Sequence, residues 1–125
     1  MCQARRNDEK LVLVVDDDSS ARESMAEILD AKGYRVLQAE NGQRALDVLK
    51  KTPRFPCLVL LDLAMPVMGG REFLERRARD PILRNIPVVV VSGNTMSDEP
   101  LEGIAAYLGK PVSIDRLIDV IQLHC

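Results

Sequence analysis

The sequence predicts an α/β domain built around a parallel sheet. Three short runs are nearly all apolar and do not alternate with polar residues: LVLVV at 11–15, CLVLL at 57–61 and VVVV at 88–91. Such runs are typical of strands that are covered on both faces. Amphipathic helical patterns separate them, and this alternation predicts right-handed crossovers with helices on both faces of the sheet.

Two further segments complete a predicted set of five strands. RVLQA at 35–39 is more polar than the three apolar runs, so it suits an edge strand. AYLG at 106–109 is a weaker candidate for the fifth strand.

Start and stop signals place the helices. A capping box over Ser20–Glu23 predicts the start of the first helix, and Gly33 predicts its end. Asn41 is expected to cap the second helix, which ends before Pro53. The third helix is predicted to start near Gly70 and to carry a solvated face over Arg71–Arg79.

The last helix shows the clearest periodicity. It is predicted to start at Ser113, and its apolar residues recur at i, i+3, i+4 and i+7 spacing. They are Ile114, Leu117, Ile118 and Ile121.

Composition limits the function classes. The 125 residues suit one domain, an apolar fraction of 46% can form a core, and the net charge is −2. An acidic chain with 3% aromatic residues is not expected to bind nucleic acid directly, and no apolar run is long enough to span a membrane. We expect a flexible arm over residues 1–9 and one domain over 10–125.

The three cysteines, Cys2, Cys57 and Cys125, form no C-x-x-C or metal-binding spacing. We interpret this odd count as a sign of a reducing cytoplasm, with Cys57 as a small buried apolar residue. The polar N-terminal segment carries no signal peptide pattern, which also favours a cytoplasmic location.

Polar residues follow four of the predicted strands. Asp16-Asp17-Asp18 follows the first strand, Asp62 the third, Ser92 ends the fourth and Lys110 comes after the fifth. The carboxyl ends of parallel strands share one edge, so these side chains are expected to converge. Carboxylates without His or Cys favour Mg²⁺, and a lysine and a hydroxyl can stabilise a phosphoryl group.

These motifs resemble the receiver domain of two-component response regulators. The resemblance rests on VVDD at 14–17, DLAMP at 62–66, VVVVSG at 88–93 and YLGKP at 107–111, in that order. It covers about residues 10–124 and implies a single, doubly wound, flavodoxin-like sheet of five parallel strands in the order 2-1-3-4-5.

The resemblance implies a role for each site residue. Asp62 would be the phospho-acceptor, and Lys110, aimed by a cis Lys110–Pro111 bond, would pair with the phosphoryl oxygens. Ser92 would be the switch hydroxyl and Tyr107 the switch aromatic. The implied residues at Mg²⁺ are Asp17, which would bind it directly, Asp16, which would bind it mainly through water, the carboxylate of Asp62 and the backbone carbonyl of Ala64.

The implied function is a phosphorylation-controlled switch. A histidine kinase or a histidine phosphotransfer domain would donate the phosphoryl group to Asp62, and a downstream protein or fused effector would respond. The domain would catalyse its own phosphorylation and dephosphorylation without being a turnover enzyme.

One alternative from another class starts from the same acidic run. Asp16-Asp17-Asp18-Ser19-Ser20 also resembles the D-x-D-x-T loop of haloacid-dehalogenase-type phosphatases, with Asp16 as nucleophile and Asp18 as general acid. No acidic metal motif follows Lys110, and Asp62 would have no role, so the receiver interpretation is favoured.

The chain departs from the receiver pattern between Ser92 and Lys110. This interval is shorter than usual by about one helical turn. Pro100 permits a helix start but not a helix interior, and Gly103 favours an early stop. We therefore predict that the fourth helix, within 94–106, is shortened or replaced by a loop.

Overall fold

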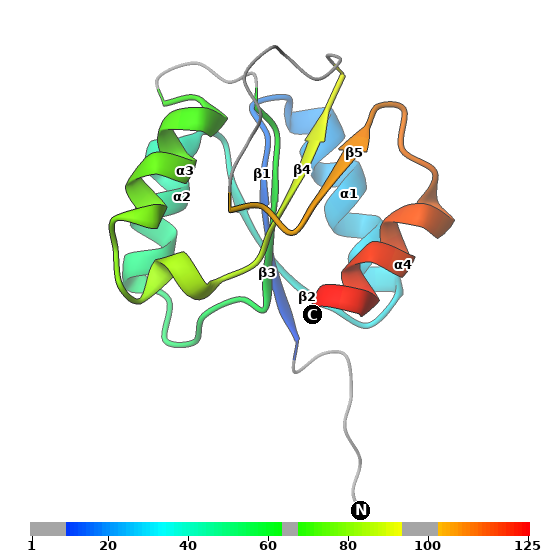
Figure 1. Ribbon diagram of the computed structural model, residues 1–125. Helices are drawn as coiled ribbons and strands as arrows, with labels where there is room; N and C mark the ends of the chain where they lie inside the picture. The colour runs from blue at the N-terminus through cyan, green and yellow to red at the C-terminus, as the bar shows by residue number, and fades with distance from the viewer. Residues whose placement is uncertain (1–9, 64–67, 94–102) are drawn as a thin grey trace, which may run out of the picture.

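A computed structural model describes residues 10–63, 68–93 and 103–125. Its centre is a parallel five-stranded sheet in the order β2-β1-β3-β4-β5, which confirms the predicted strands and their order (Figure 1). The strands are β1 (Leu11–Val15), β2 (Arg35–Ala39), β3 (Leu58–Leu61), β4 (Val88–Ser92) and β5 (Ala106–Gly109).

Helices cover both faces of the sheet, as predicted. In Figure 1, α2 and α3 lie on one side of the sheet and α1 and α4 lie on the other. The helices are α1 (Ser19–Ala31), α2 (Gly42–Lys51), α3 (Gly70–Ala78) and α4 (Ile114–His124), with a short 3-10 helix η2 (Leu83–Asn85) before β4. The predicted shortened helix falls mainly on residues 94–102, outside the described residues, and 103–105, just before β5, are not helical.

The two-sided covering explains why the central strands are uniformly apolar. Successive side chains of a strand point to opposite faces. Leu13 and Val15 pack in the cluster under α2 and α3, whereas Val12 and Val14 pack in the cluster under α1 and α4. All four side chains are buried, so both faces of β1 are apolar, and the first polar residue, Asp16, follows the strand.

The start of α1 differs from the prediction. Asp18 is the N-cap, and its Oδ1 accepts the backbone N–H of Ser20 at 3.0 Å and of Ala21 at 3.3 Å. The predicted capping box at Ser20 is therefore wrong, because a helix capped by Ser20 would begin at Ala21 and the observed helix begins two residues earlier, at Ser19. A carboxylate is also favourable beside the positive end of the helix dipole.

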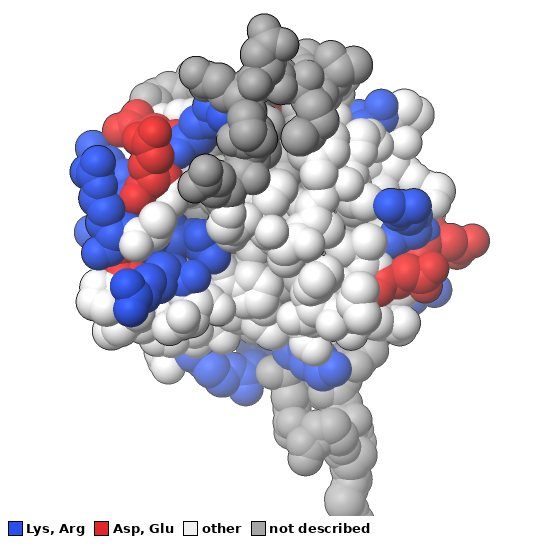
Figure 2. Space-filling model, viewed as in Figure 1, with Lys and Arg blue, Asp and Glu red and all other residues white. Residues whose placement is uncertain are grey.

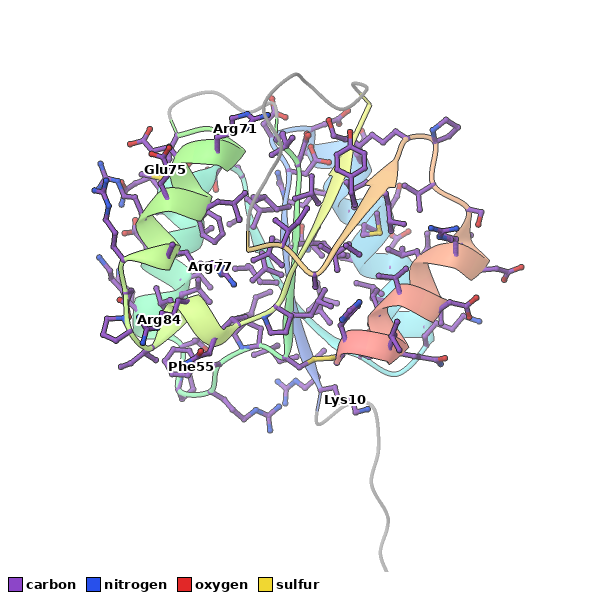
Figure 3. All side chains as sticks on the ribbon, in the orientation of Figure 1. Lys10, Phe55, Arg71, Glu75, Arg77 and Arg84 are labelled. Carbon is purple, nitrogen blue, oxygen red and sulfur yellow. A yellow bond between two sulfur atoms is a disulfide. The ribbon has the colours of Figure 1, made fainter. Side chains whose placement is uncertain are left out.

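Arg77 corrects the prediction of a solvated arginine face on α3. Its guanidinium points from α3 toward the sheet (Figure 3), and the residue is only 6% exposed. It donates to the carbonyl of Ile86 at 2.7 and 3.1 Å and to that of Arg84 at 2.9 Å. Burial lowers the pKa of Arg77 below its ordinary value. The side chain thus ties α3 to the segment that leads into β4.

The neighbours of Arg77 do face solvent. Arg76 and Arg79 are exposed, and Arg76 forms an i,i+4 ion pair with Glu72 at 3.1 Å. Figure 2 shows Lys and Arg gathered on this side of the molecule with acidic side chains among them.

The cysteines correct a second prediction. Cys57 is partly exposed and forms a disulfide with Cys125, with the two Cα atoms 5.0 Å apart. The prediction that Cys57 is simply a buried apolar residue is therefore wrong.

Among the described helices, none is long and apolar enough to cross a bilayer.

Candidate functional site

Three acidic side chains gather at the carboxyl ends of β1 and β3. One carboxylate oxygen from each of Asp16, Asp17 and Asp62 lies within 4.8 Å of the others. The strand order reverses at this point, because β1 is flanked by β2 on one side and β3 on the other. Doubly wound sheets bind ligands at such a switch point, so the fold brings the predicted acids to the expected place.

Asp16 is held by its own backbone and by its surroundings. Its N–H donates to the carbonyl of Ala39 at 3.1 Å, and its Oδ1 accepts the N–H of Asp18 at 3.0 Å. Arg22 of α1 donates to the carbonyl of Asp16 at 2.9 Å. Sequence reasoning missed this arginine, because nothing in its spacing distinguishes it from a solvent-facing residue of α1.

Asp62 lies at the end of β3, and only 8% of its surface is exposed. Its N–H continues the parallel ladder by donating to the carbonyl of Val15 at 3.0 Å. The chain then returns to the site at the start of α3, where the N–H of Gly70 donates to the carbonyl of Leu63 at 3.0 Å. The backbone on both sides of Asp62 is therefore fixed.

Gly70 leaves no room for a side chain, and this predicts a measurable effect. A Cβ there would lie 2.7 Å from Cα of Leu63 and 2.9 Å from the carbonyl oxygen of Asp62. Because both atoms belong to the backbone, we expect Gly70→Ala to cost about 1–3 kcal/mol of unfolding free energy and to displace Asp62. Denaturant unfolding measures the first effect, and the rate of the phosphorylation proposed for Asp62 measures the second.

The matched control is Gly109→Ala, because a Cβ at Gly109 meets no atom within 4 Å. We expect this variant to unfold and to react like the wild type. Equal stability of the two variants would show that the contact at Gly70 relaxes without cost.

Lys110 immediately follows the carboxyl end of β5, and its side chain approaches the same acids. Its N–H donates to the carbonyl of Ser92 at 2.9 Å, and the Lys110–Pro111 peptide bond is cis, as the resemblance implies. Its Nζ lies 3.6 Å from Oδ2 of Asp16 and 3.7 Å from Oδ2 of Asp62. The cation thus offsets the repulsion between two buried carboxylates.

Ser92 and Tyr107 occupy neighbouring strands beside the cluster. Ser92 ends β4 and is 1% exposed, whereas Tyr107 is half-buried in β5 and packs against the core under α2 and α3. Their predicted switch roles remain predictions. Ala64, the predicted carbonyl ligand, lies outside the described residues.

The acidic cluster fits a magnesium ion. Its donors are hard carboxylate oxygens, and no His or Cys belongs to it. Mg²⁺ prefers oxygen ligands and usually takes only one or two carboxylates, with the remaining positions left to water and phosphate oxygens. A site that is exposed at Asp17 and buried at Asp16 and Asp62 provides such a half-open arrangement.

An apolar cavity of about 480 Å³ adjoins the cluster on the side of α1 and α4. Ala21 and Met25 line it from α1, and Pro111 and Val112 line it from the segment before α4. Asp16, Asp62 and Lys110 also line it, so the acidic cluster and the lysine border an apolar wall. Electrostatic interactions are stronger beside such a wall than in open water.

The profile of the response regulator receiver domain family matches residues 12–122 of the chain. The chain belongs to this family. Receiver domains act as switches in two-component signalling, and they interact with histidine kinases and with effectors.

Individual relatives agree with this receiver assignment. The chain is 31% identical over 119 residues to the polar-differentiation response regulator DivK of Brucella anthropi, covering 92% of this chain and 95% of DivK. It is 34% identical to the phosphate regulon regulator PhoB of Pseudomonas aeruginosa, covering 87% of this chain but 48% of PhoB. The receiver therefore corresponds to about half the length of PhoB.

A solved structure supports the same fold. The response regulator TrrA of Thermotoga maritima, crystallised in complex with Mg²⁺ and BeF, is 27% identical, with a TM-score of 0.82. The match covers 93% of this receiver and 99% of the TrrA chain.

Proposed function

We propose that this receiver is phosphorylated on Asp62 in a reaction that requires Mg²⁺, and that the phosphoryl group switches a protein-interaction surface. The observation that carries the proposal is the arrangement of three carboxylates within 4.8 Å with Lys110 beside two of them. The Mg²⁺ and BeF in TrrA support it by similarity.

Each residue has a distinct task in the proposed site. Asp16, Asp17 and Asp62 would hold Mg²⁺ together with the backbone carbonyl of Ala64. The ion would supply positive charge that stabilises the transferring phosphoryl group. Arg22 and the N–H of Asp18 position Asp16 for this task, since they bind its carbonyl and its Oδ1.

The transfer itself uses the carboxylate of Asp62 as a nucleophile. A carboxylate oxygen forms a bond to phosphorus, while the bond between phosphorus and the imidazole nitrogen of a phosphohistidine donor breaks. The imidazole leaves with the electron pair. Lys110 is placed to meet the developing charge, and the apolar cavity offers the donor side chain an approach from the side of α1 and α4.

Phosphorylation would then shift an equilibrium between two surface states. Lys110 now pairs with carboxylates, and a phosphoryl group on Asp62 presents it with a stronger anion. We propose that Ser92 and Tyr107 respond by moving toward the site. On this proposal the domain is a self-limiting switch and not a turnover enzyme.

The proposed partners follow from the chemistry of the donor. A histidine kinase or a histidine phosphotransfer domain supplies the phosphoryl group, and a protein target or fused effector receives the signal. A cytoplasmic location is proposed with them, and neither direct nucleic-acid binding nor membrane insertion is part of the proposal.

The geometry does not favour the phosphatase alternative. Asp18, its general acid, is exposed, caps α1 and is not one of the clustered acids. Asp16, its nucleophile, has one oxygen engaged by the N–H of Asp18 and the other 3.6 Å from Lys110.

Phosphorylation by a small donor tests the proposal. The protein is incubated with phosphoramidate and Mg²⁺, and the modified aspartate is located by borohydride reduction and peptide mass spectrometry. We expect modification of Asp62 alone, and its loss when EDTA removes the metal, because the clustered carboxylates then repel the incoming phosphate. Modification of Asp16 would support the phosphatase alternative, and modification that persists in EDTA would contradict the metal site.

A further inference from the structure

The disulfide between Cys57 and Cys125 joins the start of β3 to the end of α4. Cys57 immediately precedes β3, whose other end carries Asp62, and Cys125 immediately follows α4. At the opposite end, Lys110 precedes α4 and lies 3.7 Å from Asp62. The C-terminal segment from Lys110 to Cys125 is therefore joined to both ends of β3, by the ion pair with Asp62 at the site and by the disulfide at the opposite edge of the sheet.

Both cysteines are held in position by the backbone. The N–H of Cys57 donates to the carbonyl of Leu11 at 2.8 Å, which extends the sheet, and the N–H of Cys125 donates to the carbonyl of Ile121 at 2.8 Å, which ends the helix. Their Cα separation of 5.0 Å lies in the range that disulfides adopt. The fold thus brings together two thiols that are 68 positions apart in sequence.

The disulfide adds a covalent link to the apolar packing that holds α4 against the sheet. Leu117 and Ile121 are the buried residues of α4, and both pack against the sheet. In the last turn Ile121 is buried, whereas Leu123 is 78% exposed. Figure 3 shows the disulfide beside this end of α4. Breaking the bond would leave the C-terminal turn free to fray.

The bond is also accessible to reagents. Cys57 and Cys125 are both partly exposed, so a thiol can approach the sulfur atoms without global unfolding. In the cytoplasmic location proposed above, a disulfide is expected to be transient and redox-responsive and not a permanent structural bond.

We propose that Cys57 and Cys125 form a reversible redox pair that fastens the C-terminal end of α4 to the start of β3. In reduction, a dithiol donates two electrons and two protons through a mixed disulfide. The S–S bond breaks, two protein thiols form, and the dithiol becomes a cyclic disulfide. Oxidation by a low-molecular-weight disulfide reverses the exchange. Phosphorylation of Asp62 is not needed for this step.

A redox titration tests whether the pair is reversible. The protein carries Cys2→Ser, so that only the proposed pair titrates, and is equilibrated in mixtures of reduced and oxidised dithiothreitol before alkylation and intact mass measurement. We expect one two-electron transition between a form with no alkyl group and a form with two. Two free thiols in the most oxidising mixture, or a bond reduced only after addition of denaturant, would overturn the proposal.

Amide hydrogen exchange tests what the bond does. Reduction of the Cys2→Ser protein is expected to accelerate exchange several-fold in the last turns of α4 and to leave α2 and α3 unchanged. Cys57→Ser and Cys125→Ser, each in the same background, should reproduce the reduced pattern and no longer respond to dithiothreitol. Identical exchange of α4 in the oxidised and reduced proteins would overturn the proposed fastening, whether or not Asp62 is phosphorylated.

Discussion

Asp62→Asn is expected to abolish formation of the acyl phosphate. The amide of asparagine is not a nucleophile toward phosphorus, although it has nearly the same shape as the carboxylate. Asp62 is buried at the end of β3, and its Oδ2 lies 3.7 Å from Nζ of Lys110. Incubation with phosphoramidate and Mg²⁺, followed by intact mass measurement, should show no added phosphoryl group.

Two other aspartates provide matched comparisons for Asp62→Asn. Asp16→Asn removes one proposed metal ligand, so we expect slower phosphorylation that still occurs on Asp62 and a weaker affinity for Mg²⁺. Asp18→Asn keeps a good N-cap and changes no clustered acid, so it should behave like the wild type. If Asp62→Asn still gains a phosphoryl group and Asp16→Asn does not, the assignment of the acceptor is wrong.

Arg77→Met is expected to have the largest effect on stability among the charged residues of α3. The substitution keeps an apolar stem but removes the donors to the carbonyls of Ile86 and Arg84. An unsatisfied buried polar group costs about 1–3 kcal/mol, so we expect a loss of that order in the unfolding free energy. Urea unfolding monitored by circular dichroism measures it.

Burial of the Arg77 cation costs free energy, and this cost opposes the stabilisation by its hydrogen bonds. The same burial lowers the pKa of Arg77. The guanidinium stays protonated around neutral pH, so the loss should not change with pH there. Arg79→Met, on an exposed residue of the same helix end, is the control and should change stability by no more than about 0.5 kcal/mol. Equal stabilities of the two variants would mean that the hydrogen bonds of Arg77 contribute no more free energy than the burial of its charge costs.

An Arg77→Lys variant separates charge from geometry. Lysine keeps the cation, but its single ammonium group cannot present the planar fork that reaches two carbonyls. We expect it to recover only part of the stability that Arg77→Met loses. Full recovery would show that charge alone holds the segment before β4.

The sequence alone determined the sheet and most of the site. Apolar runs without alternation can be buried only on both faces, and this requires a parallel sheet with helices on each side. A parallel sheet places the ends of its strands at one edge, so Asp16, Asp17, Asp62 and Lys110 could be assigned to one site before any distance was known. These predictions succeed because they depend on local pattern and on topology.

Only the tertiary structure decided which charged side chains of the helices become buried and which groups they contact when the layers pack. Arg77 has the same local sequence signal as its exposed neighbours, and its burial depends on the carbonyls of a segment that follows α3. Arg22 acquires its contact with Asp16 only when α1 packs against β1.

The topology of the fold could have placed the two cysteines of the disulfide at one edge of the sheet, but it could not have given their distance. A helix that follows the last parallel strand must run back along the sheet, so the end of α4 returns to the edge where β3 begins. Cys57 and Cys125 could therefore have been assigned to the same edge from the topology. Whether their Cα atoms approach to 5.0 Å depends on how closely α4 packs on the sheet, and packing distance is a property of three-dimensional contacts that a linear pattern does not contain.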